Sequence, residues 1–280
     1  MPPIDEHVET MFSYSDLQTT DLEAAKTFYT TLFGWDVDEQ PMGEGQVYAM
    51  FKKDGRTTAA AALQQPQQRD MGVPPMWTTY FTVFDVDSRT KEAERAGGTI
   101  HAQPFDVFDA GRMSVIQDPN GAVFALWQPK ENIGAEVMNE PNSLTWTECA
   151  ARDTDKGRAF YTEVFGWTFE EMDMGDGYKY TVFEKEGADN PVCGMMPLRT
   201  EGMPSFWLVY FAVESCDATA AQAKDLGAAI HQPPTDIPNV GRFAVIADPQ
   251  GASFGILRRT WRPRPQADRP APLAECGSRI

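Results

Sequence analysis

Hydrophobic positions follow two spacings along the first part of the chain. Apolar residues at positions 22, 25, 28, 29, 32 and 33 recur every three to four places, which predicts an amphipathic helix that ends at Gly34. Thr20 and Glu23, three residues apart, are placed to form a capping box at the start of this helix. Short apolar runs predict strands at residues 11–17, 46–53 and 57–63.

A second unit has the same order of elements. Residues 77–86 read as a strand, and residues 88–97 read as a helix closed by Gly97 and Gly98. Strands are predicted at residues 99–105, 111–117 and 122–128, with the sequence DPNG turning between the last two. The interpretation is that each unit contains a strand, a helix and then three strands.

The whole pattern then occurs again. The sequence EAAKTFYTTLFGW at residues 23–35 returns as KGRAFYTEVFGW at residues 156–167. Tyr161 follows Tyr29 by 132 positions, and Trp207 follows Trp77 by 130, so the register changes once, by two residues. The change falls in a segment that contains QQPQQRDMGVPP, whose composition indicates a loop. The chain is therefore predicted to be a duplicated domain of roughly 125 residues.

The repeat sets the predicted boundaries. The two domains cover residues 10–129 and 144–260, and the polar residues 130–143 form the linker. Residues 1–9 are predicted to be a flexible N-terminus. Residues 261–280, rich in Pro and Arg, are predicted to be a disordered tail.

Charge and composition narrow the class of protein. The 280 residues include 41 Asp and Glu against 24 Lys and Arg, a formal net charge of -17. This charge repels phosphate backbones and anionic lipid surfaces, so neither nucleic acid nor a membrane is an expected partner. There is no signal-peptide pattern and no run of about 18 apolar residues, which favours a cytoplasmic protein. The four cysteines are scattered and form no CxxC pair.

The motifs carry a family resemblance. Paired βαβββ units, with FYxxxFGW closing the first helix and GRxxxxxDPxGAxFxL closing the second unit, resemble the vicinal oxygen chelate superfamily. This superfamily is also called the glyoxalase, bleomycin-resistance and extradiol-dioxygenase superfamily. The chain is similar in particular to its two-domain actinobacterial members, which are described as glyoxalase-like or hydroxylase-like. The resemblance implies an α+β fold of two tandem domains, each a curved eight-stranded mixed sheet around a cavity.

The resemblance also implies where a metal ion would lie. Metal-dependent members place His, Glu or Gln ligands on the first and last strands of each unit. This sequence has poor ligands at the corresponding positions, which are Tyr14, Thr78, Ala125, Trp146, Leu208 and Gly255. We therefore predict that the metal site is lost in both domains and that no cofactor is needed. Lactoylglutathione lyase and ring-cleaving dioxygenase activities are not expected.

Two acids stand near the lost positions. Alternation along a strand places Tyr14 and Asp16 on one face, and Trp146 and Glu148 on the matching face of the second domain. An acid in an apolar cavity has a raised pKa, which suits general acid–base chemistry. The predicted catalytic residues are Asp16, Glu148, Tyr14, His101 and His231, and the predicted ligand-binding residues are Trp146, Tyr48, Thr78, Tyr80, Trp127, Tyr180 and Tyr210.

Each assignment has a structural alternative. The acids could cap a loop or pair with Arg112 or Arg242, and the histidines could fix loops at strand edges. Trp35, Trp167 and the two Phe-Tyr pairs are expected to pack the helices onto the sheets.

Two functions fit these residues. The protein could be a metal-independent isomerase, lyase or cyclase acting on a small organic metabolite. Alternatively, it could sequester a small molecule or antibiotic without catalysis, as bleomycin-resistance members do. Packing of the two halves against each other would let the chain act as a monomer, and a homodimer is the other possibility.

Overall fold

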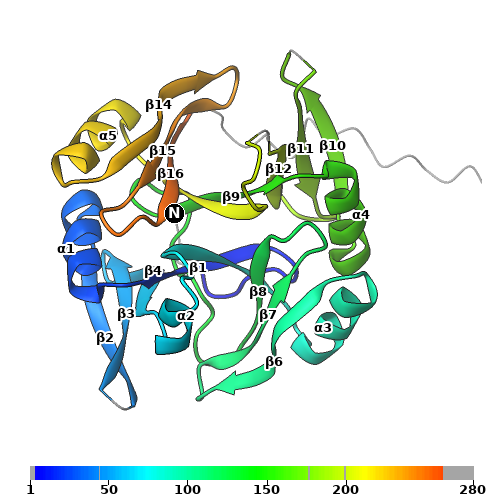
Figure 1. Ribbon diagram of the computed structural model, residues 1–280, viewed down its shortest axis with the longest axis horizontal. Helices are drawn as coiled ribbons and strands as arrows, with labels where there is room; N and C mark the ends of the chain where they lie inside the picture. The colour runs from blue at the N-terminus through cyan, green and yellow to red at the C-terminus, as the bar shows by residue number, and fades with distance from the viewer. Residues whose placement is uncertain (1–3, 44, 176, 199, 261–280) are drawn as a thin grey trace, which may run out of the picture.

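The computed structural model describes residues 4–260 except 44, 176 and 199. It contains two eight-stranded mixed sheets, one in each half of the chain. Figure 1 shows the two halves one above the other. The strand order is β2-β3-β4-β1-β5-β8-β7-β6 in the first domain and β10-β11-β12-β9-β13-β16-β15-β14 in the second. The two orders are identical once the labels are shifted by eight, which confirms the predicted tandem α+β fold.

In the first domain, β1 and β5 lie side by side at the centre of the sheet and run antiparallel. Each is parallel to the last strand of its own unit, β4 and β8. The elements of this domain are β1 (Phe12–Thr19), α1 (Leu22–Phe33), β2 (Asp36–Gly43), β3 (Gln46–Lys53), β4 (Arg56–Leu63), α2 (Pro66–Asp70), β5 (Met76–Thr82), α3 (Val86–Arg95), β6 (Thr99–Val107), β7 (Gly111–Gln117) and β8 (Val123–Pro129).

The second domain repeats this arrangement without the short helix α2. Its elements are β9 (Leu144–Ala151), α4 (Thr154–Phe165), β10 (Thr168–Asp173), β11 (Lys179–Glu184), β12 (Cys193–Pro197), β13 (Phe206–Ala212), α5 (Cys216–Asp225), β14 (Ala229–Ile237), β15 (Gly241–Ala247) and β16 (Ser253–Arg259).

The predicted start and end of helix α1 can be compared with the structure. Gly34 has φ of 70° and ends the helix in the left-handed conformation, as predicted. The predicted capping box at Thr20 is wrong, because Asp21 is the N-cap and its carboxylate accepts the Ala24 backbone N–H at 3.0 Å. An ionised carboxylate next to a helix N-terminus is also favoured by the helix dipole. Asp153 caps α4 in the same way.

Sequence patterns placed no residues in two elements of the first domain. Strand β2 carries the polar sequence DVDEQPMG at the edge of the sheet, so no apolar alternation marks it. The segment predicted to be a loop contains the five-residue helix α2, none of whose residues is buried. Both elements lack the hydrophobic periodicity on which the predictions depend.

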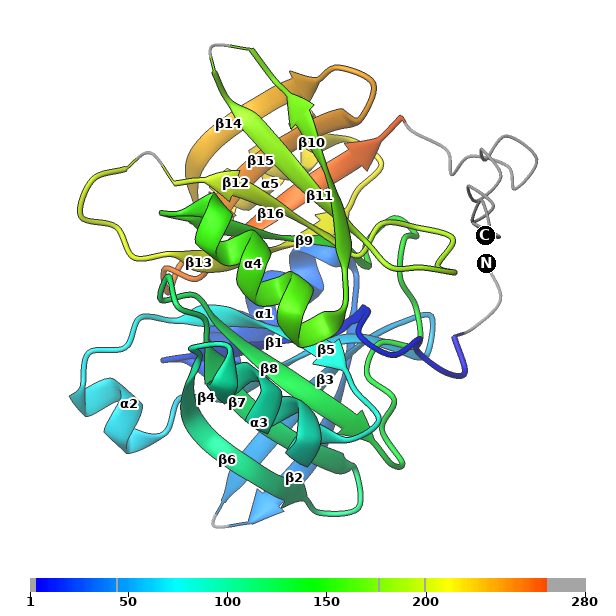
Figure 2. The same cartoon turned by 90° about the vertical axis from the view of Figure 1, so that its right-hand side faces the viewer.

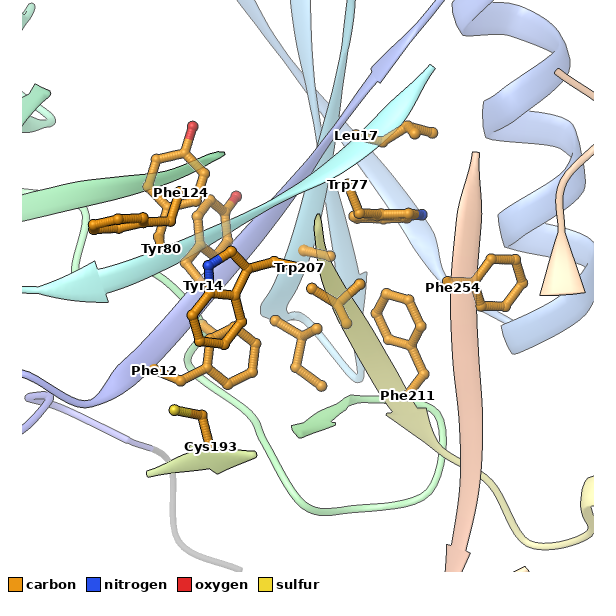
Figure 3. Packing of buried hydrophobic residues seen from close by; sticks show 14 of the residues in the cluster. Phe12, Tyr14, Leu17, Trp77, Tyr80, Phe124, Cys193, Trp207, Phe211 and Phe254 are labelled. Carbon is orange, nitrogen blue, oxygen red and sulfur yellow. The ribbon is translucent and has the colours of Figure 1, made fainter. Parts of the chain in front are cut away.

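The domains pack through the sheet faces that carry the helices. The Thr79 hydroxyl of β5 lies 3.0 Å from the Thr147 hydroxyl of β9. Around this point, Trp77 of the first domain packs against Phe211 of the second, with 5.2 Å between ring centres (Figure 3). Helix α1 lies beside α5 and α3 lies beside α4 (Figure 1). Figure 2 shows α1 and α4 at the junction between the domains. One aromatic core therefore joins the two sheets.

The predicted linker packs closely on the first domain. The backbone N–H of Ala135 donates to Ser13 O of β1, and those of Glu136 and Val137 donate to Thr57 O of β4. From the N-terminal segment, His7 is buried and its Nε2 lies 2.8 Å from Ala135 O. The predicted tail at 261–280 lies outside the described residues. Among the residues described, no helix is both long and apolar enough to cross a membrane.

Candidate functional site

The faces opposite the helices carry the two predicted acids. We call the face formed by Tyr14, Asp16, Tyr48, Thr78, Tyr80 and Trp127 cup 1. We call the face formed by Trp146, Glu148, Tyr180, Leu208, Tyr210 and Leu257 cup 2. Strand register explains the first grouping. Asp16 lies opposite Thr78, and Tyr14 lies opposite Tyr80, so the central residues of cup 1 share one side of the sheet.

In cup 1, two phenols hold one carboxylate oxygen. Tyr80 and Tyr48 donate hydrogen bonds to Asp16 Oδ2 at 2.9 and 3.2 Å. Asp16 is only 4% exposed. Its Oδ1 has no partner of hydrogen-bond geometry among the described residues, although the Gln18 and Thr78 side chains lie close enough to lower the pKa of the carboxyl group. Tyr14 lies beside this group, with its hydroxyl 3.5 Å from that of Tyr48. Asp16 Oδ1 is therefore a buried acceptor whose hydrogen-bonding capacity is unused within the described residues.

Cup 2 has the same arrangement with both oxygens paired. Tyr210 donates to Glu148 Oε1 at 2.5 Å, and Tyr180 donates to Glu148 Oε2 at 2.8 Å. Trp146 takes the place of Tyr14, and its indole N–H donates to the Tyr180 hydroxyl at 3.0 Å. The structure thus brings four of the predicted tyrosines into hydrogen-bond contact with the two acids. We call these two groups the carboxyl–tyrosine clusters.

Small residues make room for the tyrosines of cup 2. Gly194 lies opposite Glu148, and a Cβ atom there would lie 1.9 Å from the Tyr180 hydroxyl. A Cβ at Gly255 would lie 2.1 Å from Cδ1 of Tyr210. Since neither approach is sterically possible, the glycines let the two rings lie against the strands. Alanines at positions 60 and 125 take these places in cup 1.

Burial raises the pKa of both acids. It raises the pKa of Asp16, and the hydrogen bonds from Tyr80 and Tyr48 offset part of this effect. Burial likewise raises the pKa of Glu148 against the hydrogen bonds from Tyr210 and Tyr180. A carboxyl group with a raised pKa can exchange a proton closer to neutral pH, as a general acid or base must.

A cavity of about 390 Å³ opens at the side of cup 1. Its lining includes Met50 of β3 and Gly134 and Glu136 of the linker. Met50 and Asp16 are each paired with Ala60 of β4. Met50 and Asp16 therefore lie two interstrand spacings apart, or about 10 Å. The linker separates this cavity from Tyr14, because a Cβ at Gly134 would lie 3.2 Å from Tyr14 Cβ.

The remaining predicted residues lie farther out. His101 and His231 are exposed on the edge strands β6 and β14, which three strands separate from β1 and β9. Each falls at a register shift in its strand. The structure does not bring them into the carboxyl–tyrosine clusters. Thr78 is half-buried opposite Asp16, and Trp127 donates its N–H to Asn132 O of the linker at 2.8 Å.

The arginines proposed as alternative partners of the acids are engaged elsewhere. Arg112 pairs with Asp87 at 2.8 Å, and Arg242 pairs with Asp217 at 2.8 Å. Neither arginine forms an ion pair with Asp16 or Glu148, so the loop-capping or ion-pair reading does not describe these acids.

The donor set does not fit the metal that this kind of fold often holds. Within the described ranges, no three His, Cys, Asp or Glu side chains come together to hold an ion. Each cup offers one carboxylate surrounded by phenols, alanines or glycines. A divalent ion needs three or four imidazole, carboxylate or thiolate donors, so we derive no step through a metal.

Comparison with known proteins identifies the family. The Glyoxalase/Bleomycin resistance protein/Dioxygenase superfamily matches residues 7–126 and again residues 143–256. The chain belongs to this superfamily. The two matches coincide with the two sheets, so each domain of the duplicated chain is one superfamily domain.

Several members of the superfamily are similar to the chain over most of its length. A Mycobacterium tuberculosis protein named "Putative glyoxylase CFP32" is 44% identical over 267 residues, covering 95% of this chain and 100% of that protein. The Streptomyces peucetius protein named "Anthracycline biosynthesis protein DnrV" is 36% identical over 258 residues, covering 88% of this chain and 92% of that protein.

Solved superfamily structures share the fold at low identity. The 2,3-dioxygenase LapB from Pseudomonas sp. KL28 has a TM-score of 0.63 at 15% identity and covers 92% of this chain and 96% of its own. The Mn(II)-bound glyoxalase from Novosphingobium aromaticivorans has a TM-score of 0.61 at 16% identity, with 90% and 83% covered. At this identity the likeness shows the fold alone.

Sequence reasoning missed one charged residue of cup 2. Arg259 stands at the end of β16, with its guanidinium carbon 5.5 Å from the Trp146 ring centre. Its counterpart in the first domain, 130 positions earlier, is Pro129. Arg259 was missed because the comparison of the two repeats considered only the residues that they share. The difference between the repeats was the signal that could have found it.

Proposed function

We propose that the protein acts on a small aromatic metabolite by acid–base chemistry that needs no metal, with Asp16 carrying the proton. The observation that supports this most directly is the unpaired Oδ1 of Asp16, an acceptor buried in an aromatic cup. The names of two relatives from Streptomyces, both called anthracycline biosynthesis proteins, favour a planar polycyclic substrate.

The proposed step is a proton transfer within one substrate. Asp16 Oδ1 takes a proton from an acidic C–H or O–H group, and the electron pair stays on the substrate as an enolate or phenolate. The neutral carboxyl group is favoured by its buried surroundings and then returns the proton to another atom of the same molecule. Tyr80 and Tyr48 hold Oδ2, so the orientation of Oδ1 is fixed throughout.

A pair of measurements tests this function. Hydroxylated anthraquinones and related polycyclic ketones are screened for those that raise the melting temperature. The ones that bind are then followed for conversion and for deuterium uptake from D₂O. Asp16→Asn is expected to lower turnover by about 10² to 10⁴-fold with little change in affinity. Asp54→Asn, which removes an exposed carboxylate from the same domain, serves as the matched control.

The outcome separates catalysis from sequestration. Binding without conversion or deuterium uptake by the wild-type protein would replace the enzyme with a ligand-sequestering protein. Full turnover by Asp16→Asn would remove Asp16 from the chemistry. Glu148→Gln, measured in parallel, reports whether the second cluster takes part.

A further inference from the structure

Cup 2 contains an arginine that forms no ion pair within the part of the chain that the structure describes. Arg259 is half-buried, and one of its terminal nitrogens donates to Thr145 O at 2.7 Å. It forms no ion pair with a carboxylate of the described chain, whereas Arg112 and Arg242 each pair with two aspartates. Toward the residues that the structure describes, the guanidinium of Arg259 therefore keeps several N–H donors for a ligand.

Burial makes this free charge unfavourable in the unliganded protein. It lowers the pKa of Arg259 to about 10, so the side chain stays charged at neutral pH but is poorly solvated. The Trp146 ring provides part of the lost stabilisation by a cation–π contact. An anion that formed hydrogen bonds with the guanidinium would provide more, because charge-assisted hydrogen bonds are strong where water is scarce.

An apolar surface lies next to this charge. Leu208, Tyr210 and Leu257 form a buried cluster separate from the main core. Four hydrophobic side chains that pack against this cluster are only partly buried; they are Trp146, Phe206, Phe243 and Val245. This surface can receive a flat apolar ring.

Cup 1 lacks the charge and has a different apolar surface. Pro129 stands where Arg259 does. Its aromatic residues Tyr14, Tyr80 and Trp127 belong to the main core, and the linker contacts two of them, at Gly134 and Asn132. The two cups are therefore not equivalent, although they descend from one repeated sequence.

We propose that cup 2 is a binding site for a planar aromatic carboxylate, with the ring on the apolar cluster and the carboxylate on Arg259. The inference rests on the proposed function only in that the cups take small molecules, and it does not require Asp16 to act on them. It gives the two halves of the duplicated chain different roles.

Naphthalene-2-carboxylate and its uncharged carboxamide are suitable probes, titrated by calorimetry into the full-length protein. Arg259→Gln is expected to weaken carboxylate binding by about 10- to 100-fold and carboxamide binding by less than about threefold. Arg258→Gln is the matched control, because Arg258 is the neighbouring, exposed residue on the other face of β16. It is expected to leave both affinities unchanged.

Several results would overturn the inference. Equal losses in Arg258→Gln and Arg259→Gln would mean a long-range charge effect, and equal losses for the two probes would mean a packing role. Carboxylate binding with no dependence on Arg259 would reject the carboxylate site while leaving the proposed function intact. No binding of either probe to the wild-type protein would count against both. If Arg259→Gln does not fold, Arg259→Lys keeps the charge without the planar fork. A loss of carboxylate affinity with carboxamide affinity kept would then support the inference, and equal losses for the two probes would overturn it.

Discussion

The Tyr29 hydroxyl of α1 donates a hydrogen bond across the domain boundary to Asp248 Oδ2, at 2.9 Å. Tyr161 of α4 repeats this bond with Asp118 of the first domain, at 2.8 Å. The FYxxxFGW motif of each domain thus meets the DPxG turn of the other. Trp77 also donates its N–H to the Tyr29 hydroxyl at 3.0 Å, so the phenol lies between two polar groups.

Removal of this phenol oxygen should destabilise the protein. Tyr29→Phe leaves Asp248 Oδ2 and the Trp77 N–H without their buried partner, which is expected to lower the free energy of unfolding by about 1–3 kcal/mol. Urea denaturation measures the effect. Thr27→Val removes an exposed hydroxyl from the same helix and should change stability by less than about 0.5 kcal/mol. Equal stability of Tyr29→Phe and wild type would show that the bond between the domains contributes nothing.

Stability should also depend on pH through the two acids in the cups. The folded protein keeps the protons of Asp16 and Glu148 at pH values where the unfolded chain, with pKa values of about 3.8 and 4.5, has lost them. Their contribution to stability is therefore present below the unfolded pKa values and is lost as pH rises through the folded ones. Asp16→Asn combined with Glu148→Gln removes this loss.

Urea denaturation from about pH 5 to about pH 8 measures this effect. The difference in unfolding free energy, amide variant minus wild type, is expected to increase with pH above the unfolded pKa values and to level off once the pH exceeds the folded ones. Asp118 and Asp248 have pKa values that burial also raises, but they are present in both proteins and cancel. A difference that stays constant or decreases with pH would mean that folding does not raise the pKa values of the two acids.

A third prediction concerns the space under Tyr210. Gly255→Ala places a methyl group against this ring, so the ring must move away from Glu148. We expect a loss of about 1–3 kcal/mol in stability. Urea denaturation measures the loss, and the tyrosine signals in near-ultraviolet circular dichroism should change with it. Ala125→Gly at the matching place in cup 1 creates space instead and should cost about 0.5–1 kcal/mol. Wild-type stability and spectrum for Gly255→Ala would contradict the packing described for cup 2.

The sequence by itself determined the duplication, the order of elements in each unit and the face on which the acids lie. These features follow from local periodicity, since alternation of two residues sends Asp16 to one side of β1 whatever surrounds it. Elements without such periodicity were missed, as the polar edge strand β2 shows. The cap of α1 was misplaced by one residue because two adjacent side chains, Thr20 and Asp21, suit the same role.

Only the tertiary structure decided which residues meet. Tyr80 reaches Asp16 across 64 positions, and Tyr29 reaches Asp248 across 219, through strand register and domain packing. No local pattern specifies contacts that are so distant in sequence. The inequality of the cups has the same origin, because the linker folds over cup 1 while Arg259 stacks on Trp146 in cup 2. Two copies of one sequence pattern thus acquire different chemistry from what packs against them.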